Sequence, residues 1–359
     1  MDDFNLWLVS GGLFIGLLFG IVVQRTQFCM VTAVSNVVLM RAFRHAHGYF
    51  AGLLIAVLGT LFLETSGLAA ISETGYRMPR YDWLVIIGGG LLFGVGSMLA
   101  GGCAGRTTVR AAEGNLGALV VLLAFALTAA ATYFGALEPY RVWLIQNTAV
   151  ELDAADSALS AVLGLPLWIG PAVIGIACLV GIFFLGRARR SYGLIAAGIV
   201  VGALVVAGWY ITGYLSQDDF SEHRPASITI AGPLARATVF LTTGSLPGGG
   251  FTISVLMGIV AGALASALVT RSFHLIIQEA QHLKHLLAGG ALMGIGAICA
   301  GGCNIGIGLT GMSTGSISAL TAVLAIVAGM LLGIALLTRT EKLDARNYHH
   351  RQATHSVGV

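Results

Sequence analysis

Charged side chains are scarce in this sequence. Of its 359 residues, 10% are Asp, Glu, Lys or Arg and 57% are hydrophobic, whereas soluble domains carry about 25% charged residues. Such a chain has too little polar surface to enclose a water-soluble core of this size. Apolar runs of roughly 18 or more residues are typical of transmembrane helices, and such runs fill most of the sequence. We therefore expect an all-α polytopic membrane protein.

Several functional classes lack their sequence signals. No basic cluster is large enough to indicate nucleic acid as a partner, and no P-loop or HExxH motif is present. Cys299 and Cys303 are spaced C-x3-C, but no second Cys pair or His lies beside them, and a structural zinc needs four close ligands. We expect no metal, no cofactor and no enzymatic activity. The five Cys residues lie in or beside apolar segments, which is atypical of a secreted disulfide framework.

The apolar runs divide into about nine candidate membrane spans. Two further apolar segments, 28–40 and 233–244, are too short to span and too apolar for exposed loops, so we interpret them as re-entrant or non-spanning helices. The predicted spans are 5–23, 48–68, 83–101, 116–134, 166–186, 192–211, 250–270, 285–301 and 317–338.

Basic residues predict the orientation of these spans. Arg and Lys follow every odd-numbered span, and the alternate loops are acidic or mixed. Cytoplasmic loops carry the excess of Lys and Arg, so we expect the N-terminus outside and the C-terminus inside. The basic residues are Arg41, Arg44, Arg106, Arg110, Arg187, Arg189, Arg190, Arg271, Lys284, Arg339, Lys342, Arg346 and Arg351.

An internal repeat links the two ends of the chain. Residues 88–103 and 288–303 are identical at nine of sixteen aligned positions, and both copies end in AGGC. The flanking spans also correspond, which predicts a single transport domain (1–340) with repeat halves 5–134 and 192–338, followed by a polar cytoplasmic tail (341–359). The connecting span 166–186 gives the second half the opposite orientation, as in the inverted-topology repeats of many transporters.

Three cysteines are candidate functional residues. Cys103 and Cys303 each follow two glycines at the end of a span, and such breaks expose backbone N–H groups to anions. The alternative interpretation is tight packing of small residues with an incidental Cys. Cys178 and Cys299 are interpreted as packing residues, since Leu99 is the repeat partner of Cys299. The glycines concerned are Gly101, Gly102, Gly301 and Gly302.

A third motif, QRTQFC, ends the first span. It places Cys29 at the start of the short apolar segment, with Arg25 four residues earlier. Arg25 is either a binding residue or an interfacial anchor whose charged end extends to the membrane surface.

Together QRTQFC, the doubled AGGC and the spacing of the spans resemble the YeeE/YedE family of sulfur transporters, over roughly residues 5–340. In that family the first motif usually reads QRGRFC, so Thr26 and Gln27 depart from it. The resemblance implies import of thiosulfate or a related sulfane-sulfur anion across the bacterial inner membrane, with functional cysteines at Cys29, Cys103 and Cys303. It also implies a cytoplasmic TusA-like sulfur-carrier protein as a partner for some members.

Thiols and backbone N–H groups suit such a cargo. Weak S–H donors contact its soft sulfur, N–H groups contact its oxygens, and neither holds the anion too tightly for passage. We expect a non-covalent relay in the order Cys303, Cys103, Cys29 from outside to inside. Three alternatives remain open: transport of another sulfur or selenium compound, a membrane sulfur sensor, and a thiol-disulfide enzyme with Cys299 and Cys303 as its local pair.

Overall fold

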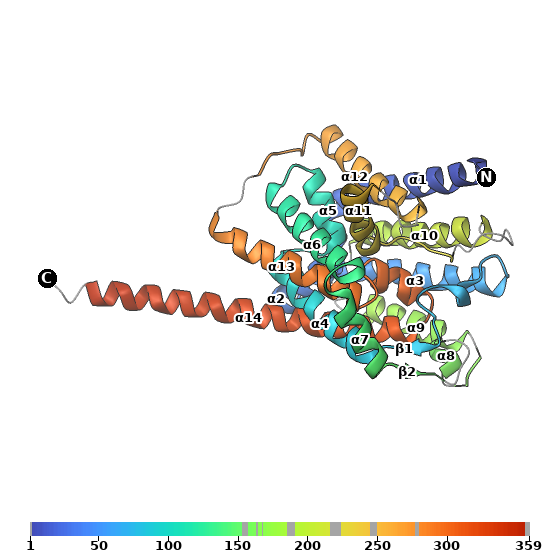
Figure 1. Cartoon of the computed structure of the whole chain (residues 1–359). Coiled ribbons are helices and arrows are strands. Elements are labelled where there is room, and N and C mark those ends of the chain that lie inside the picture. The colour runs from blue at the N-terminus through green and yellow to red at the C-terminus, as the bar shows by residue number, and fades with distance from the viewer. Residues whose placement is uncertain are drawn as a thin grey trace.

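The computed structural model is mostly helical, and the residues that it describes include one small two-stranded sheet. The elongated helices lie side by side, and the start of α1 and the end of α14 lie at opposite ends of the molecule (Figure 1). The structure describes residues 2–152, 157–162, 164–166, 168–184, 191–215, 224–244, 250–276 and 280–355.

The nine predicted spans all correspond to helices. The long apolar helices are α1 (Asp2–Thr26), α3 (Arg44–Thr65), α4 (Trp83–Leu99), α6 (Leu116–Phe134), α9 (Ile169–Phe184), α10 (Tyr192–Leu215), α12 (Gly250–Val269), α13 (Ala280–Cys299) and α14 (Ile317–His355). Among the described residues, seven segments are long and apolar enough to cross a membrane, and α9 and α13 supply two shorter apolar stretches. An all-α polytopic membrane protein is confirmed.

Short elements connect the long helices. The two predicted non-spanning segments form helices α2 (Met30–Met40) and α11 (Ala231–Thr243). After each AGGC comes another short element, α5 (Ala104–Ala112) in the first copy and a π-helix, η2 (Gly306–Gly311), in the second. The remaining elements are η1 (Ile71–Glu73), β1 (Arg80–Tyr81), α7 (Glu138–Thr148), β2 (Val150–Glu151) and α8 (Leu159–Val162).

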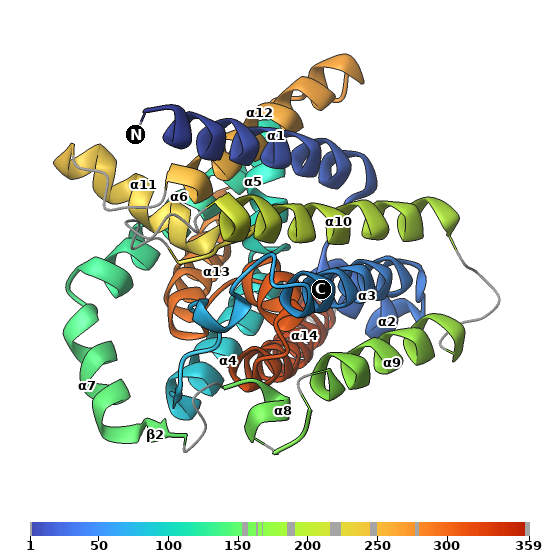
Figure 2. The same cartoon turned by 90° about the vertical axis from the view of Figure 1, so that its right-hand side faces the viewer.

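Four helix pairings organise the bundle. Helix α1 packs on α12, α10 packs on α3, α14 packs on α4, and α13 packs on α6. Helices α4 and α13 also pack against each other, as do α1 and α10. Helices α9 and α10 lie beside α3 when the molecule is turned (Figure 2).

Two regions differ from the expectation of simple loops. The segment 66–82 folds back into the protein, where Ile71 and Arg77 are buried and Arg77 forms an ion pair with Glu64. Strand β1 then pairs antiparallel with β2, with Arg80 opposite Glu151. Helix α14 continues to His355, so the predicted tail begins as a helical extension of the last span.

Candidate functional site

Cys29 and Cys103 meet in the interior of the protein. Cys29 precedes α2 and Cys103 precedes α5, and both backbones are extended, with φ −162° and −79°. Both residues are at least 98% buried, and their sulfur atoms lie 3.2 Å apart. Two segments separated by 74 residues therefore present their thiols to one point.

Each thiol belongs to the first residue before a helix. The carbonyl of Cys29 accepts the first helical hydrogen bond of α2, from the N–H of Ala33, and that of Cys103 accepts from Thr107. The N–H groups in the first turn of a helix have no partner within the helix, so they carry partial positive charge. The N–H of Thr32 is directed at the Cys29 sulfur and that of Arg106 at the Cys103 sulfur.

Cys303 occupies the corresponding place in the second copy. It is fully buried, and its carbonyl accepts from the N–H of Ile307 at 2.8 Å. Two helix starts point at its sulfur: the N–H groups of Ile305 and Gly306 near η2, and those of Ile230 and Ala231 at α11. Backbone N–H groups thus face all three predicted functional thiols.

The glycines before Cys103 and Cys303 turn the chain out of its helix. Gly101 has φ +71° and Gly301 has φ +82°, values that glycine adopts without steric penalty. Gly102 and Gly302 follow, and the N–H of Gly102 bonds to the carbonyl of Ser97, which closes the end of α4. The glycines therefore end one helix so that another can start at the thiol.

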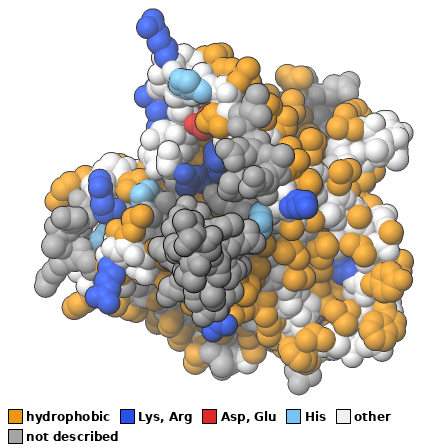
Figure 3. Space-filling view, turned by 90° about the vertical axis from the view of Figure 1, so that its left-hand side faces the viewer, with side chains coloured by type: hydrophobic (Ala, Val, Ile, Leu, Met, Phe, Trp, Pro, Cys, Tyr) orange, Lys and Arg blue, Asp and Glu red, His pale blue; other side chains and the backbone are white. Residues whose placement is uncertain are grey.

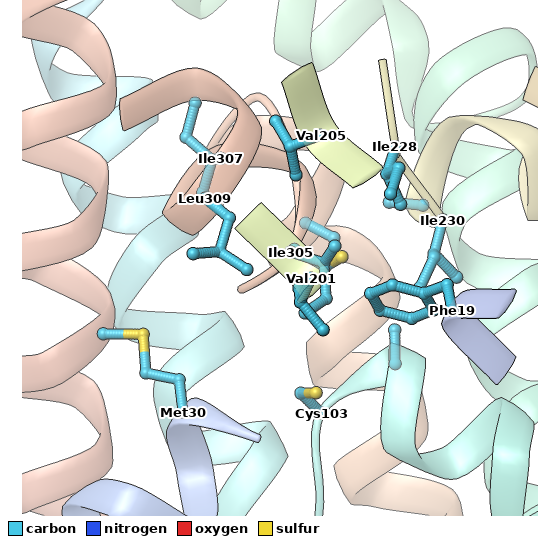
Figure 4. Close-up of a cluster of buried hydrophobic side chains, with 14 of the residues drawn as sticks. Phe19, Met30, Cys103, Val201, Val205, Ile228, Ile230, Ile305, Ile307 and Leu309 are labelled. Atoms are coloured by element: carbon cyan, nitrogen blue, oxygen red, sulfur yellow. The ribbon is translucent and has the colours of Figure 1, made fainter. Parts of the chain in front are cut away.

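Apolar side chains fill the space between the two copies. Phe19, Ile230 and Ile305 lie in one cluster with Cys103 (Figure 4). A Cβ atom placed on Gly105 would lie 2.9 Å from Ile230 Cδ1, 3.4 Å from Ile305 Cγ1 and 4.0 Å from Cys103 Sγ. Buried apolar side chains therefore surround Cys103 on the side that faces α11 and the second copy.

A cavity of about 260 Å³ with a mainly polar lining lies next to the segments that carry Cys29 and Cys103, and neither thiol lines it. Arg106, three residues after Cys103, donates to Gln27 Oε1 at 3.1 Å and to the hydroxyl of Thr32. Arg106 therefore ties α5 to the segment that carries Cys29. The cavity is lined by Val23, Gln24, Gln27, Arg106, Val109, Arg110, Glu113, Asn115, Ser272, His274 and Ile276.

The structure does not bring Arg25 to the thiols. Its side chain is exposed and donates from Nε to Ser266 Oγ on α12 at 3.1 Å, and it does not line the cavity. The same serine donates to Gln24 Oε1 at 2.7 Å. A direct role for Arg25 in binding stays a prediction.

The other two cysteines lie apart from this arrangement. Cys178 is buried within α9. Cys299, the last residue of α13, packs against α4, where its Cβ lies 2.6 Å from the position that a Cβ on Gly89 would take. All five cysteines are free. The two thiols that the structure brings into contact are Cys29 and Cys103, and the pair named from the spacing, Cys299 and Cys303, stays an untested alternative. Among the described residues, no group of three or more His, Cys, Asp or Glu side chains is placed to hold a metal ion.

Sequence reasoning missed Tyr49 of α3. Its ring stacks on Phe28, with centroids 5.9 Å apart, and its hydroxyl donates to the carbonyl of Asn304 at 3.3 Å. Tyr49 therefore joins the residue before Cys29 to the residue after Cys303. A single tyrosine in an apolar span is a weak signal, and only the fold shows its position.

Comparison with known proteins places the sequence in a family. The profile of the family described as Sulphur transport matches residues 25–332. A protein of Spirochaeta thermophila named thiosulfate transporter TsuA is 33% identical over 320 residues, covering 85% of this chain and 92% of the relative. A protein of the same name from Escherichia coli is 26% identical over 326 residues, covering 84% and 87%. The chain belongs to the sulphur transport family and is a multi-pass membrane protein.

Proposed function

We propose that this protein imports thiosulfate, or a related sulfane-sulfur anion, through a central path lined by Cys303, Cys103 and Cys29. The observation that carries the proposal is the contact between two buried free thiols, each at the start of a short helix. The names of the two TsuA relatives favour thiosulfate as the cargo. The protein acts as a transporter and carries out no covalent chemistry on the anion.

The chemistry of the path suits an anion with a soft sulfur atom. Thiols are weak donors, and the N–H groups at helix starts favour negative charge without a fixed full charge. Sites of this strength allow an anion to enter and also to leave. The anion passes from Cys303 to Cys103 and Cys29 by successive contacts, and no covalent bond forms.

An inverted repeat relates the two halves of the path in this proposal. A Cβ on Gly96 would lie 2.8 Å from the Gly289 carbonyl oxygen, and a Cβ on Gly296 would lie 2.6 Å from that of Gly89. Adding 200 to a residue number in the first half, and subtracting 200 from one in the second half, converts each of these two contacts into the other. The helix pairings behave in the same way, because α1 on α12 exchanges with α10 on α3, and α4 on α14 with α13 on α6. Both observations support a twofold axis between α4 and α13.

The orientation in this proposal is N-terminus outside and C-terminus inside, in a bacterial inner membrane. Lys, Arg and His side chains gather on the face toward which α14 extends (Figure 3). Basic residues mark the cytoplasmic side of membrane proteins. With this orientation the polar cavity at Arg106 is the inner end of the path. A cytoplasmic sulfur-carrier partner stays a prediction of the family resemblance.

The test is uptake of ³⁵S-thiosulfate by cells that lack their own uptake systems and express this protein. We expect uptake well above that of cells with an empty vector, competed by unlabelled thiosulfate and unaffected by equimolar chloride. Membrane-inserted protein without such uptake would contradict the proposal. If sulfite or selenite competes more strongly than thiosulfate, that anion is the cargo, and the proposed path of cysteines is retained.

A further inference from the structure

The side chain of Asn304 is a buried polar group with no hydrogen-bond partner in the part of the chain that the structure describes. Asn304 follows Cys303 directly and has no exposed surface. Neither its Nδ2 nor its Oδ1 atom has a hydrogen-bond partner among the described residues. Buried polar side chains are bonded in the large majority of cases, and each exception needs an explanation such as an unseen ion or ligand.

The polar side chains that follow Asn304 in the chain do have hydrogen-bond partners. Each Ser and Thr hydroxyl from η2 to the residue before α14 donates to a main-chain carbonyl. The bonds are Thr310 to Ile228, Ser313 to Thr310, Thr314 to Gly311 and Ser316 to Tyr76. Asn304 also does not act as a helix cap, because Ile305 is the capping residue of η2 and no side chain caps that element. Local packing therefore satisfies its neighbours and leaves the Asn304 amide free.

The position of Asn304 is fixed by its backbone. Its carbonyl accepts the Tyr49 hydroxyl, and the fully buried Cys303 precedes it. In the first copy of the repeat the equivalent residue is Ala104, which has no polar side-chain atom. The amide is therefore a feature of the Cys303 site alone.

We propose that the Asn304 amide binds the oxygen atoms of the transported anion while Cys303 contacts its soft sulfur. This inference rests on the proposed function. An asparagine amide offers two N–H donors, which match the oxygens of a sulfonate group. Because the amide is neutral, it adds selectivity for an oxyanion and keeps the site weak enough for release.

The experiment is thiosulfate binding to the purified full-length protein, measured as a Kd by thermal shift in detergent, for wild type and Asn304→Leu. Leucine has a similar size and no donor. We expect a Kd roughly ten- to a hundredfold higher in Asn304→Leu, as for a lost hydrogen bond to a charged group. The Tm without thiosulfate should not fall, because no protein partner is lost. A lowered Tm without ligand together with an unchanged Kd would show a structural role and overturn the inference.

Two further variants complete the test. Asn304→Asp keeps the shape of the side chain and removes both N–H donors, so it should also weaken binding at least tenfold, and it serves if the leucine variant does not fold. Thr60→Val is the matched control. The Thr60 hydroxyl is similarly buried and has no partner among the residues that the structure describes, but it lies about 16 Å along α3 from Tyr49. Its Kd should equal that of wild type.

The outcomes separate the two proposals. Wild-type protein that neither binds nor transports thiosulfate contradicts the proposed function. Wild-type protein that binds thiosulfate, with Asn304→Leu and Asn304→Asp variants of equal affinity, overturns only the assignment of Asn304.

Discussion

The two AGGC regions share a backbone design and differ in side chains. In both, glycines end a long helix and a cysteine precedes a short one. Around Cys103 lie a second thiol, Cys29, and Arg106 beside a polar cavity. Ile230 precedes α11 in the way that Cys29 precedes α2. The residue next to Cys303 is Asn304, which carries a neutral amide. The repeated part supplies helix starts, and the parts that differ would distinguish the two ends of the proposed path.

The largest effect should come from oxidising the thiol pair. Diamide, which takes two hydrogens from two thiols and is itself reduced to a hydrazine, should join Cys29 to Cys103, because their sulfur atoms are already in contact. We expect loss of thiosulfate uptake and its recovery with dithiothreitol, with the linked peptides identified by mass spectrometry. Cys29→Ser protein should show no such link. A disulfide formed by Cys303 instead would contradict the view that the two AGGC regions differ in having or lacking a second thiol.

The shared backbone can be tested by a pair of equivalent substitutions. Gly96→Leu and Gly296→Leu each place a side chain against backbone at the α4–α13 contact, where even a Cβ would lie 2.7 Å and 2.4 Å from main-chain nitrogens. Each should lower the free energy of unfolding by about 3 kcal/mol, seen as a lower Tm in detergent. Gly88→Ala is the control, because nothing lies within 4 Å of its Cβ position. Unequal losses in the two variants would argue against the twofold relation.

A smaller effect should follow from Arg106→Gln. The substitution removes the bonds to Gln27 and Thr32 and one positive charge at the cavity, but leaves both thiols in place. Uptake measured at low thiosulfate concentration should fall roughly tenfold, as for a hydrogen bond made by a charged group. Arg80→Gln, an exposed arginine paired with Asp82, should keep wild-type uptake. Equal uptake in both variants would remove Arg106 from the path.

The smallest effect is expected for Cys299→Leu. The first copy of the repeat already has leucine at the equivalent position, Leu99, and Cys299 packs against α4. Uptake and Tm should stay within twofold and about 2 °C of wild type, since a partly exposed apolar exchange changes stability little. A loss as large as that of a path cysteine would contradict the packing role.

The sequence predicted the long helices because each is an uninterrupted apolar run. The span 116–134 agrees with α6 at both ends, and the short segments at 28–40 and 233–244 are helices as expected. Helix α7 was missed, because its 11 residues mix charged and apolar side chains and bury none. The inward fold of 66–82 includes the buried ion pair of Arg77 with Glu64, which no local pattern reveals.

The candidate site was predictable in part. Repeated motifs and the family resemblance named three cysteines as candidates, whereas their spacing along the chain could not show that Cys29 and Cys103 touch. That contact, the bridge from Phe28 through Tyr49 to Asn304, and the link from Arg106 to Gln27 all join distant segments. Such contacts arise from the packing of the bundle and need the fold to be seen.

The most direct measurement is thiosulfate uptake by proteoliposomes that contain the purified protein, with Cys103→Ala and Cys178→Ala compared with wild type. Cys103 belongs to the first AGGC region and contacts Cys29, whereas Cys178 lies in α9, away from both AGGC regions in sequence. We predict that Cys103→Ala lowers uptake at least tenfold at equal protein content and that Cys178→Ala leaves it unchanged. Full uptake by Cys103→Ala protein would contradict the cysteine relay.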